Sequence, residues 1–478
     1  MTLKITVTSL FSLILLAGCG GSGSGDVTGD TFGGSSTPVN PTTTADNTPT
    51  TGEQEAVEIN TGADELNLQL GDAGLCTPEG INAWVDAQMR DYYIFADQVP
   101  VVDPSEYPNP SALLTDLRVA PDTFSSISPQ ATRTALFEEG ETFGFGFRWR
   151  RDQAGALRFV NIASGSPLDV ANALRGDRVI ALNGIPELNI TNELFEQIFG
   201  EQGVPTAVTF TIERDDVTQD IEVTSGVYNL NTVANVQTFE QNGSTVGYIE
   251  SSIFLRTSEA ELDAAIAQMV QANPTDVILD FRYNGGGFVF VAQKLAAQLA
   301  GTDFAGEVFQ NTEFNETYTR FNQSSLLEPQ QLNLNLPRVI ILTTGGTASA
   351  AEAVANNLRP YLDVVMIGSV TAGKPFASVA NPNCEQVLNA MDRITSNNNG
   401  ETVLGGLTPT CQIQDEWLHP MFSPDDALFG AALTYLETNA CPTSIALASG
   451  QLEIRANFLS APIDTYRDMQ LPSAMMIQ

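Results

Sequence analysis

Two residues that can act together in acyl transfer lie 25 positions apart in this chain, Ser349 and Lys374. Ser349 follows a glycine pair and opens an alanine-rich stretch, and Lys374 lies in a turn of small residues. A serine hydroxyl attacks a carbonyl carbon when a base takes its proton, and a lysine is a base only when its amine is neutral. The chain has three lysines in 478 residues. Retention of one at this place predicts a nucleophile with a buried amine as its base.

The residues around Ser349 predict a buried strand, a glycine turn and a helix. Residues 339–342 form a continuous apolar run, residues 345–346 are both glycine, and Pro360 marks the end of the helix. The N–H groups in the first turn of a helix have no partner within that helix, so they point at a negative charge developing on a substrate oxygen. We expect the N–H of Ala350 to be one such donor.

A second buried strand, residues 277–282, is expected to bring the other donor. It ends in a glycine run, and we expect Gly286 or Gly287 to supply the N–H group, because a side chain there would block an approaching carbonyl. Asp280 and Arg282 leave the same strand. We expect these two charged residues to brace the end of the strand.

The surroundings of Lys374 suit a neutral amine. Residues 372–377 carry no other charge and follow the buried strand 364–367, so burial is expected to lower the pKa of the amine. Glu352 lies three residues after the serine on the same helical face and is a candidate to orient the amine, although a carboxylate too close would raise the lysine pKa. His419, the only histidine, is an alternative base, but we expect it to be structural.

The first residues predict export and lipid attachment. One basic residue, Lys4, precedes the apolar run 10–16, which is too short to span a membrane. The Leu-Ala-Gly-Cys box that follows resembles a bacterial lipoprotein signal, which implies that Cys19 becomes the lipid-carrying N-terminus. A plain secretory signal with an incidental cysteine is the alternative. Residues 1–19 are then the signal peptide, and residues 20–64, rich in Gly, Ser, Thr and Pro, are a disordered tether.

The four remaining cysteines predict disulfides. An even number of cysteines in an oxidising compartment favours two bridges, and four cysteines allow three pairings. We expect Cys384 to pair with Cys411, which closes a local loop, and Cys76 to pair with Cys441. No CxxC pair or Cys/His cluster is present, so we expect no metal site and no cofactor.

Two regions precede the catalytic residues. Residues 65–140 are predicted to be helical, since Thr77 and Pro78 form an N-cap and first-turn pair ahead of apolar residues at helical spacing. Residues 141–226 change to short strands with a period of two.

This β-rich region resembles a PDZ domain of the bacterial protease type. The resemblance lies in a Gly-Phe-Gly-Phe run, a Ser-Gly-Ser-Pro turn, an Arg-Gly-Asp-Arg segment and an Asn-Gly turn, in that order. It implies a groove in which backbone N–H groups bind a peptide's terminal carboxylate and the peptide adds a strand. The residues that would do this are Gly144, Phe145, Gly146 and Phe147.

Residues 227–440 alternate between strand and helix, and residues 441–478 form a C-terminal extension. Ser258 and Glu261 are expected to form a capping box that opens a helix running to about residue 271. The fold class is therefore a multidomain α/β (α+β) protein with a helical N-terminal region, a small β-rich domain and an α/β core.

Together these motifs resemble the C-terminal processing, or tail-specific, peptidases of the S41 family of serine proteases. Residues 345–352 read Gly-Gly-Thr-Ala-Ser-Ala-Ala-Glu, residues 280–287 read Asp-Phe-Arg-Tyr-Asn-Gly-Gly-Gly, and the likeness covers about residues 75–440. It implies a core like that of ClpP and crotonase. The roles implied by the resemblance are Ser349 as nucleophile, Lys374 as general base, and Ala350 with the Gly286 region as oxyanion hole.

The chain departs from the family pattern after the lysine. Many members carry Gly next and Gln four residues on, whereas this chain has Pro375 and Ser378. The third catalytic group is therefore open: the Ser378 hydroxyl is one candidate, and Glu352 acting alone is the other.

The formal net charge of −36 argues against nucleic acid and anionic lipid surfaces as partners. We expect an envelope serine endopeptidase that recognises proteins or peptides at or near their C-terminus and cleaves them through an acyl-enzyme. An adaptor protein is a further candidate partner, and membrane contact is expected through the lipid anchor only. The resemblance to bacterial lipoproteins implies that the glycine after Cys19 favours anchoring of the protein in the outer membrane, where it faces the periplasm or the cell surface. The alternatives are a catalytically inactive relative that binds or escorts peptides, and an acyl-handling enzyme of related core.

Overall fold

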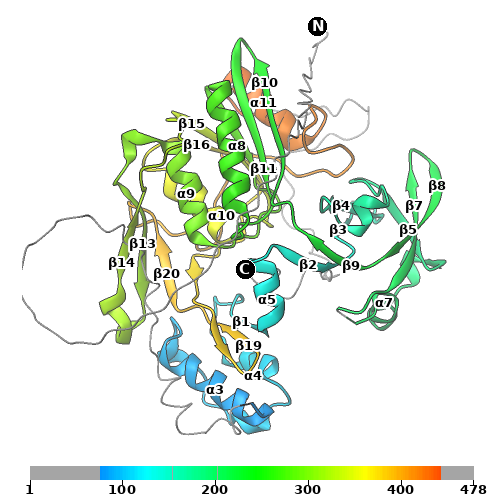
Figure 1. The fold of residues 1–478 in the computed structure, drawn as a ribbon, viewed down its shortest axis with the longest axis vertical. Helices are drawn as coiled ribbons and strands as arrows, with labels where there is room; N and C mark the ends of the chain where they lie inside the picture. Colours follow the sequence, from blue (N-terminus) through cyan, green and yellow to red (C-terminus); the bar gives the residue numbers. More distant parts are fainter. Residues whose placement is uncertain (1–75, 153, 202, 443–478) are drawn as a thin grey trace, which may run out of the picture. The chain divides into compact units, whose positions relative to one another are not determined.

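The computed structural model describes residues 76–442 apart from residues 153 and 202 (Figure 1). The predicted signal peptide, the tether with Cys19, and the chain beyond residue 442 lie outside the described residues. Within the described part, none of the helices combines the length and the apolar character needed to cross a membrane.

A six-stranded sheet forms the centre of the fold, in the order β10-β11-β12-β15-β16-β21. β10 is antiparallel to β11, and each later pair is parallel, with Leu279 beside Ile341 and Ile341 beside Met366. The strands are β10 (Val233–Gln241), β11 (Ser244–Ser251), β12 (Asp276–Asp280), β15 (Arg338–Thr343), β16 (Asp363–Gly368) and β21 (Cys411–Gln412). The three apolar runs identified in the sequence are thus neighbouring strands.

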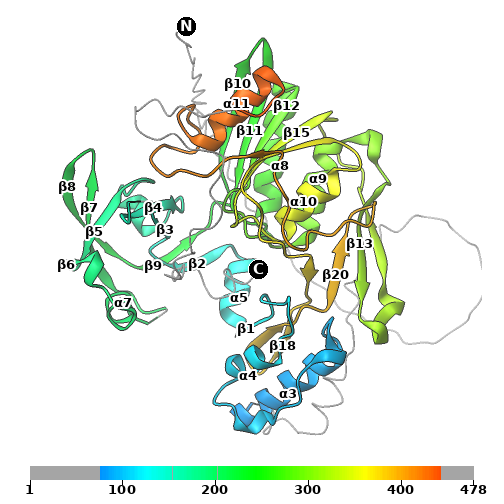
Figure 2. The same cartoon turned by 180° about the vertical axis from the view of Figure 1, so that it is seen from behind.

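Helices cover both faces of this sheet, which explains why the middle of each central strand is a continuous apolar run. Leu279 and Ile341 belong to the core beneath one set of helices, and Ile278 and Ile340 belong to the core beneath α11 on the opposite face (Figure 2). The helices of the first face are α8 (Ser258–Ala272), α9 (Val289–Ala300) and α10 (Ala350–Leu358), and α11 is Ala427–Thr438. The end of α10 before Pro360 agrees with the sequence prediction.

The capping box predicted at the start of α8 is wrong. Thr257 is the N-cap residue, and the Ser258 hydroxyl donates to the carbonyl of Ile253. Glu261 instead accepts hydrogen bonds from Thr232 Oγ1 at 2.7 Å and Val233 N at 2.9 Å. The pattern failed because these side chains bind the preceding segment and an adjoining strand rather than their own helix end.

The N-terminal region is helical as predicted, but it also contributes a strand that joins it to the core. Thr77 caps α3, and β1 pairs antiparallel with β19, which is supplied by a segment far along the chain. The elements are α3 (Pro78–Asp91), η1 (Ala96–Gln98), η2 (Pro104–Glu106), α4 (Pro110–Leu117), β1 (Ser126–Pro129), α5 (Gln130–Phe137), β18 (Asn381–Asn383) and β19 (Gln386–Asn389).

The predicted disulfide pairing is wrong. Cys76 pairs with Cys384, and Cys411 pairs with Cys441. The first bridge follows from the packing of α3 against the β18–β19 hairpin, where Asn381 Nδ2 donates to Gln88 Oε1. The second joins the sheet strand β21 to the chain just after α11, which packs on that sheet.

Residues 145–223 enclose a hydrophobic cluster of their own. Its sheet has the order β3-β4-β5-β7-β8, with β6 beside β5. The elements are β3 (Phe147–Arg151), β4 (Leu157–Ile162), α6 (Pro167–Val170), β5 (Arg178–Leu182), β6 (Ile185–Pro186), η3 (Glu187–Asn189), α7 (Asn192–Phe199), β7 (Ala207–Arg214) and β8 (Val217–Thr224). The paired strands β2 (Glu141–Gly144) and β9 (Gly226–Asn229) lead into and out of it.

A four-stranded sheet in the order β14-β13-β20-β17 lies beside the core. Its strands β13 and β17 supply Gln310 and Phe376 to the candidate site. The elements are η4 (Thr302–Phe304), β13 (Val308–Phe314), η5 (Glu316–Phe321), β14 (Gln323–Leu326), β17 (Phe376–Ala377) and β20 (Arg393–Ser396).

Candidate active site

Ser349 occupies a strained turn between β15 and α10. Its backbone dihedral angles are φ 56° and ψ −119°, a combination that costs a residue other than glycine about 1–3 kcal/mol. Bonds to the end of the neighbouring strand hold the turn: Thr347 Oγ1 donates to the Phe281 carbonyl at 2.7 Å, and Ala348 N donates to the Asn284 carbonyl at 3.0 Å. The tertiary structure therefore imposes this strained conformation, which holds Ser349 at the start of α10.

The glycine run lies directly against this turn. A Cβ atom at Gly286 would lie 2.7 Å from Ser349 Cβ and 3.1 Å from Ala350 N, and φ is +105° there, so glycine is required. The N–H of Gly286 donates to Asn284 Oδ1 at 2.9 Å. Gly287 packs on the backbone of Phe254, with φ +125°. The predicted oxyanion donors thus lie on two segments that meet at the serine, but the N–H of Gly286 is taken by Asn284, which favours Gly287 as the donor from the glycine run.

Glu352 joins the serine turn to the lysine turn. Its side chain is fully buried, and one carboxylate oxygen accepts from Ser349 N at 2.8 Å and from Lys374 N at 2.9 Å. The other accepts from Gly373 N at 2.7 Å and from the Thr371 hydroxyl. Burial raises the pKa of Glu352, and these hydrogen bonds oppose the rise. The carboxylate thus fixes the backbone at both predicted catalytic residues.

Lys374 is buried, with 5% of its surface exposed. Burial lowers the pKa of its amine to about 8, although the negative charges of Asp122 and Glu352 oppose this. Its Nζ lies 5.4 Å from the centre of the Phe124 ring. The sequence reasoning missed Asp122 and Phe124, which reach the lysine from the N-terminal region.

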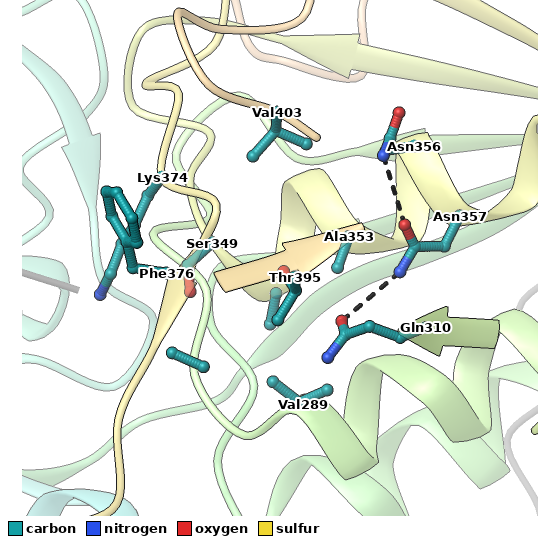
Figure 3. A pocket seen from close by; sticks show the side chains of 12 residues that line it. Val289, Gln310, Ser349, Ala353, Asn356, Asn357, Lys374, Phe376, Thr395 and Val403 are labelled. Carbon is teal, nitrogen blue, oxygen red and sulfur yellow. Dashed lines mark hydrogen bonds between the residues drawn. The ribbon is translucent and has the colours of Figure 1, made fainter. Parts of the chain in front are cut away.

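Ser349 and Lys374 line one pocket of about 340 Å³, counting the space open to solvent (Figure 3). Along α10 the pocket follows residues one and two turns beyond the serine. Amide groups form part of its wall, since Asn357 Nδ2 donates to Gln310 Oε1 at 3.5 Å. The lining residues are Val289, Gln310, Ser349, Ala350, Ala353, Asn356, Asn357, Lys374, Phe376, Ala377, Thr395 and Val403. Ser378, a candidate third group, is not among them.

Asp280 and Arg282 do brace the strand end, as expected. Arg282 is buried, and its guanidinium contacts Asp280 at 2.8 Å, Asp426 at 2.8 Å and Asp415 at 3.0 Å. Arg175, which precedes β5, joins the same cluster through Asp415 at 3.0 Å. A buried charge cluster of this kind is strongly destabilised by loss of a single partner.

His419 lies with this cluster and not with the pocket. Its Nδ1 is 3.0 Å from Glu416 Oε1, and its carbonyl accepts from Arg175 Nε at 3.0 Å. This placement agrees with the structural role expected for the histidine.

The Gly-Phe-Gly-Phe run forms the turn between β2 and β3. The side chains of Phe145 and Phe147 are buried in the hydrophobic cluster of residues 145–223, and the carbonyl of Gly146 accepts from Ala163 N at 2.8 Å. Within the described residues, the N–H of Gly146 donates to no backbone carbonyl. β3 is the terminal strand of its sheet order.

A parallel α/β core with a serine raised at a helix start, glycines against it and a buried lysine nearby defines the class of the acyl-transferring hydrolases. Comparison with known proteins gives the family. Residues 245–412 match Peptidase family S41, and residues 80–126 match the Peptidase S41 N-terminal domain. The part of the chain that holds Ser349 and Lys374 is therefore an S41 peptidase domain.

The relatives agree with this assignment. A carboxyl-terminal-processing protease of Picosynechococcus is 24% identical over 237 residues, which cover 49% of this chain and 55% of that protein. The carboxy-terminal processing protease CtpA of Bacillus subtilis is 27% identical over 232 residues, covering 48% of this chain and 47% of that protein. The chain thus spans about half the length of these curated relatives.

Among solved structures, a putative S41 protease from Bacteroides fragilis has the same fold. Its TM-score is 0.62 at 24% identity, and the match covers 75% of this chain and 97% of that one.

Proposed function

We propose that this protein is a serine endopeptidase of the cell envelope that uses Ser349 as nucleophile and Lys374 as general base. The observation that carries the proposal is the shared support of the two residues. Glu352 binds the backbone of both, and burial lowers the pKa of the Lys374 amine to about 8. A base of this pKa is partly neutral at physiological pH and strong enough to take the serine proton.

In the proposed reaction, the Ser349 hydroxyl attacks the scissile carbonyl while the Lys374 amine takes its proton. N–H groups of Ala350 and Gly287 stabilise the resulting oxyanion, each contributing about 10²–10³ in rate, whereas the N–H of Gly286 is bonded to Asn284. Lys374 then gives the proton to the leaving amine, which leaves an acyl-enzyme on Ser349. The neutral amine next activates water, which releases the acid product and restores the serine.

The test is hydrolysis of an unfolded protein by the wild type, Ser349→Ala and Lys374→Met, with products followed by mass spectrometry. Fragments from the wild type alone, with kcat/KM rising with pH to a midpoint near 8, support the proposal. Equal fragmentation by Ser349→Ala would exclude this nucleophile.

For substrate recognition, we assign the turn Gly144, Phe145, Gly146 and Phe147 to the binding of protein C-termini. Among the described residues, the N–H of Gly146 donates to no backbone carbonyl, and β3 lies at the edge of its sheet. Relatives of the chain are named carboxyl-terminal processing proteases, which also supports the assignment. A peptide adding beside β3 would place its carboxylate at the turn. Loss of cleavage when a substrate's C-terminus is amidated tests this assignment.

The proposed location is the bacterial envelope, with Cys19 as a lipid anchor to the outer membrane. It rests on the lipoprotein-like box in the sequence. Cys19→Ser should release the protein from membranes into the soluble fraction. Retention of the variant in the membrane fraction would exclude the anchor.

A peptide-binding relative without catalysis is the second candidate, because Ser378 stands where many family members carry Gln. The two candidates separate cleanly. A binding protein retains peptides equally well in the wild type and in Ser349→Ala and cleaves them in neither.

A further inference from the structure

The N-terminal region and the core meet at the lysine turn. The ring of Phe95 lies 5.6 Å from the ring of Phe376, and that of Phe124 lies 6.4 Å from it. Ser125 Oγ accepts from Met391 N at 3.0 Å, and Ile94 N donates to the Met391 carbonyl at 2.8 Å. The segment that carries Phe124 is therefore fixed against the core two residues from Lys374.

Asp122 organises that segment from within. One carboxylate oxygen accepts from Phe124 N at 2.7 Å and Ser125 N at 2.9 Å. The other accepts from Tyr93 Oη at 2.8 Å and from the Ser125 hydroxyl at 2.5 Å. The side chain is 4% exposed, and all of these partners are donors, which suits an ionised carboxylate because that group only accepts.

We propose that Asp122 is a positioning residue for the Lys374 amine, so that the N-terminal region completes the active site. Its catalytic meaning rests on the proposed function. A carboxylate held here attracts the amine, and the turn that it caps lays the Phe124 ring under Nζ, where an ammonium ion is also favoured.

The physical reason for such a residue is the balance that a lysine base requires. Complete burial alone lowers the pKa of an amine by up to about 3–5 units, and an amine lowered that far is a weak base. A buried negative charge nearby reverses part of this fall in the pKa of the amine. It also stabilises the ammonium ion that exists between the attack and the departure of the leaving group.

The charged and titratable groups around this amine come from two elements. Asp122 acts from the N-terminal region and Glu352 from α10. Asp122 is faced in turn by Tyr93, and Arg118 donates to the carbonyls of the same turn. The carboxylate of Glu352 accepts hydrogen bonds from the backbone of the serine turn and the lysine turn, so its removal would disturb both turns. Removal of the Asp122 charge leaves these bonds in place.

The test is a direct titration of Lys374, which needs no peptidase activity. With only three lysines in the chain, ¹³C-labelled lysine gives few NMR signals, and Lys294, paired with Asp263 at 2.8 Å, is an internal reference. Asp122→Asn preserves the shape of the side chain and can still accept from both backbone N–H groups. Tyr93→Phe is the matched control, because it removes one hydrogen bond from Asp122 and leaves the charge.

We expect the Lys374 midpoint, near 8 in the wild type, to fall by about half a pH unit or more in Asp122→Asn and to stay in Tyr93→Phe. The ratio of kcat/KM at pH 7 to that at pH 9 should rise about 2.5-fold in Asp122→Asn. A folded Asp122→Asn with an unchanged midpoint would overturn the proposal.

If Asp122→Asn does not fold, Asp122→Ser, whose hydroxyl can also cap the turn, takes its place. Unfolding of both variants would count against the proposal, since it would assign the carboxylate to folding alone. A wild type that cleaves nothing would refute the proposed function, while the lysine titration would still decide the role of Asp122.

Discussion

Burial of Lys374 has a cost in stability, and its replacement by methionine should remove that cost. The amine has an ordinary pKa of 10.5 in the unfolded chain and about 8 in the fold. Between these two values the unfolded chain binds a proton that the folded chain does not. Stability therefore rises as the pH is raised from about 8 to 10.5, and at neutral pH the buried amine opposes folding.

The magnitude follows from the two pKa values. Their difference corresponds to about 3 kcal/mol at neutral pH, at about 1.4 kcal/mol per pH unit, and about 2.5 kcal/mol of it disappears between pH 7 and pH 10. Methionine has a similar length and carries no charge. Lys374→Met should therefore be more stable than the wild type by about 2–3 kcal/mol at pH 7 and by under about 1 kcal/mol at pH 10.

The assay is urea unfolding of both proteins at the two pH values, with Lys294→Met as the control. Lys294 is 25% exposed and forms a surface pair with Asp263, so its replacement should cost about 0–1 kcal/mol at either pH. Destabilisation by Lys374→Met that is equal at pH 7 and pH 10 would refute the reasoning. It would mean that packing, and not a buried charge, decides the effect.

Three other substitutions test the site and its support. Glu352→Gln puts an N–H₂ group against at least one backbone N–H and should lower the free energy of unfolding in urea by about 2–4 kcal/mol. The control is Glu261→Gln, which should lower it by under about 1 kcal/mol because one oxygen of Glu261 accepts from both of its donors. Equal losses of stability in the two variants would contradict the argument. Gly286→Ala should lower kcat at least about 100-fold, because its Cβ would lie 2.7 Å from Ser349 Cβ, and a variant with wild-type kcat would show that the glycine is dispensable. Cys441→Ser opens the 30-residue loop from Cys411 and should lower the free energy of unfolding by about 4 kcal/mol in non-reducing urea, with no change under reducing conditions.

The local parts of the site could be predicted from the sequence. Strand, turn and helix follow from apolar runs, glycines and Pro360, so the position of Ser349 at the start of α10 needed no tertiary information. Lys374 was identified because lysine is scarce and its neighbours are small. Glu352 was identified by its spacing from the serine, but its role was not, because spacing does not show which groups a buried carboxylate binds.

The parts that depend on packing between distant segments could not be predicted. The charge of Asp122 acts on Lys374 because its segment, which leads into β1, packs beside the lysine turn, and no pattern around either residue announces that packing. The prediction of the disulfide pairing was wrong for the same reason. Cysteine spacing does not determine connectivity, and a short loop from Cys384 to Cys411 looked favourable until the fold placed each cysteine beside a different partner.

The pairing of β1 with β19 also sets an order of events for a chain that is synthesised from its N-terminus. Asp122 and Phe124 appear early and Lys374 late, and the strand that joins their segments is among the last parts of the core to emerge. Contacts between such distant residues close a long loop and form late in folding. The emerging protein therefore passes through most of its synthesis without a completed lysine environment, and the finished fold is the first state in which the whole site can act.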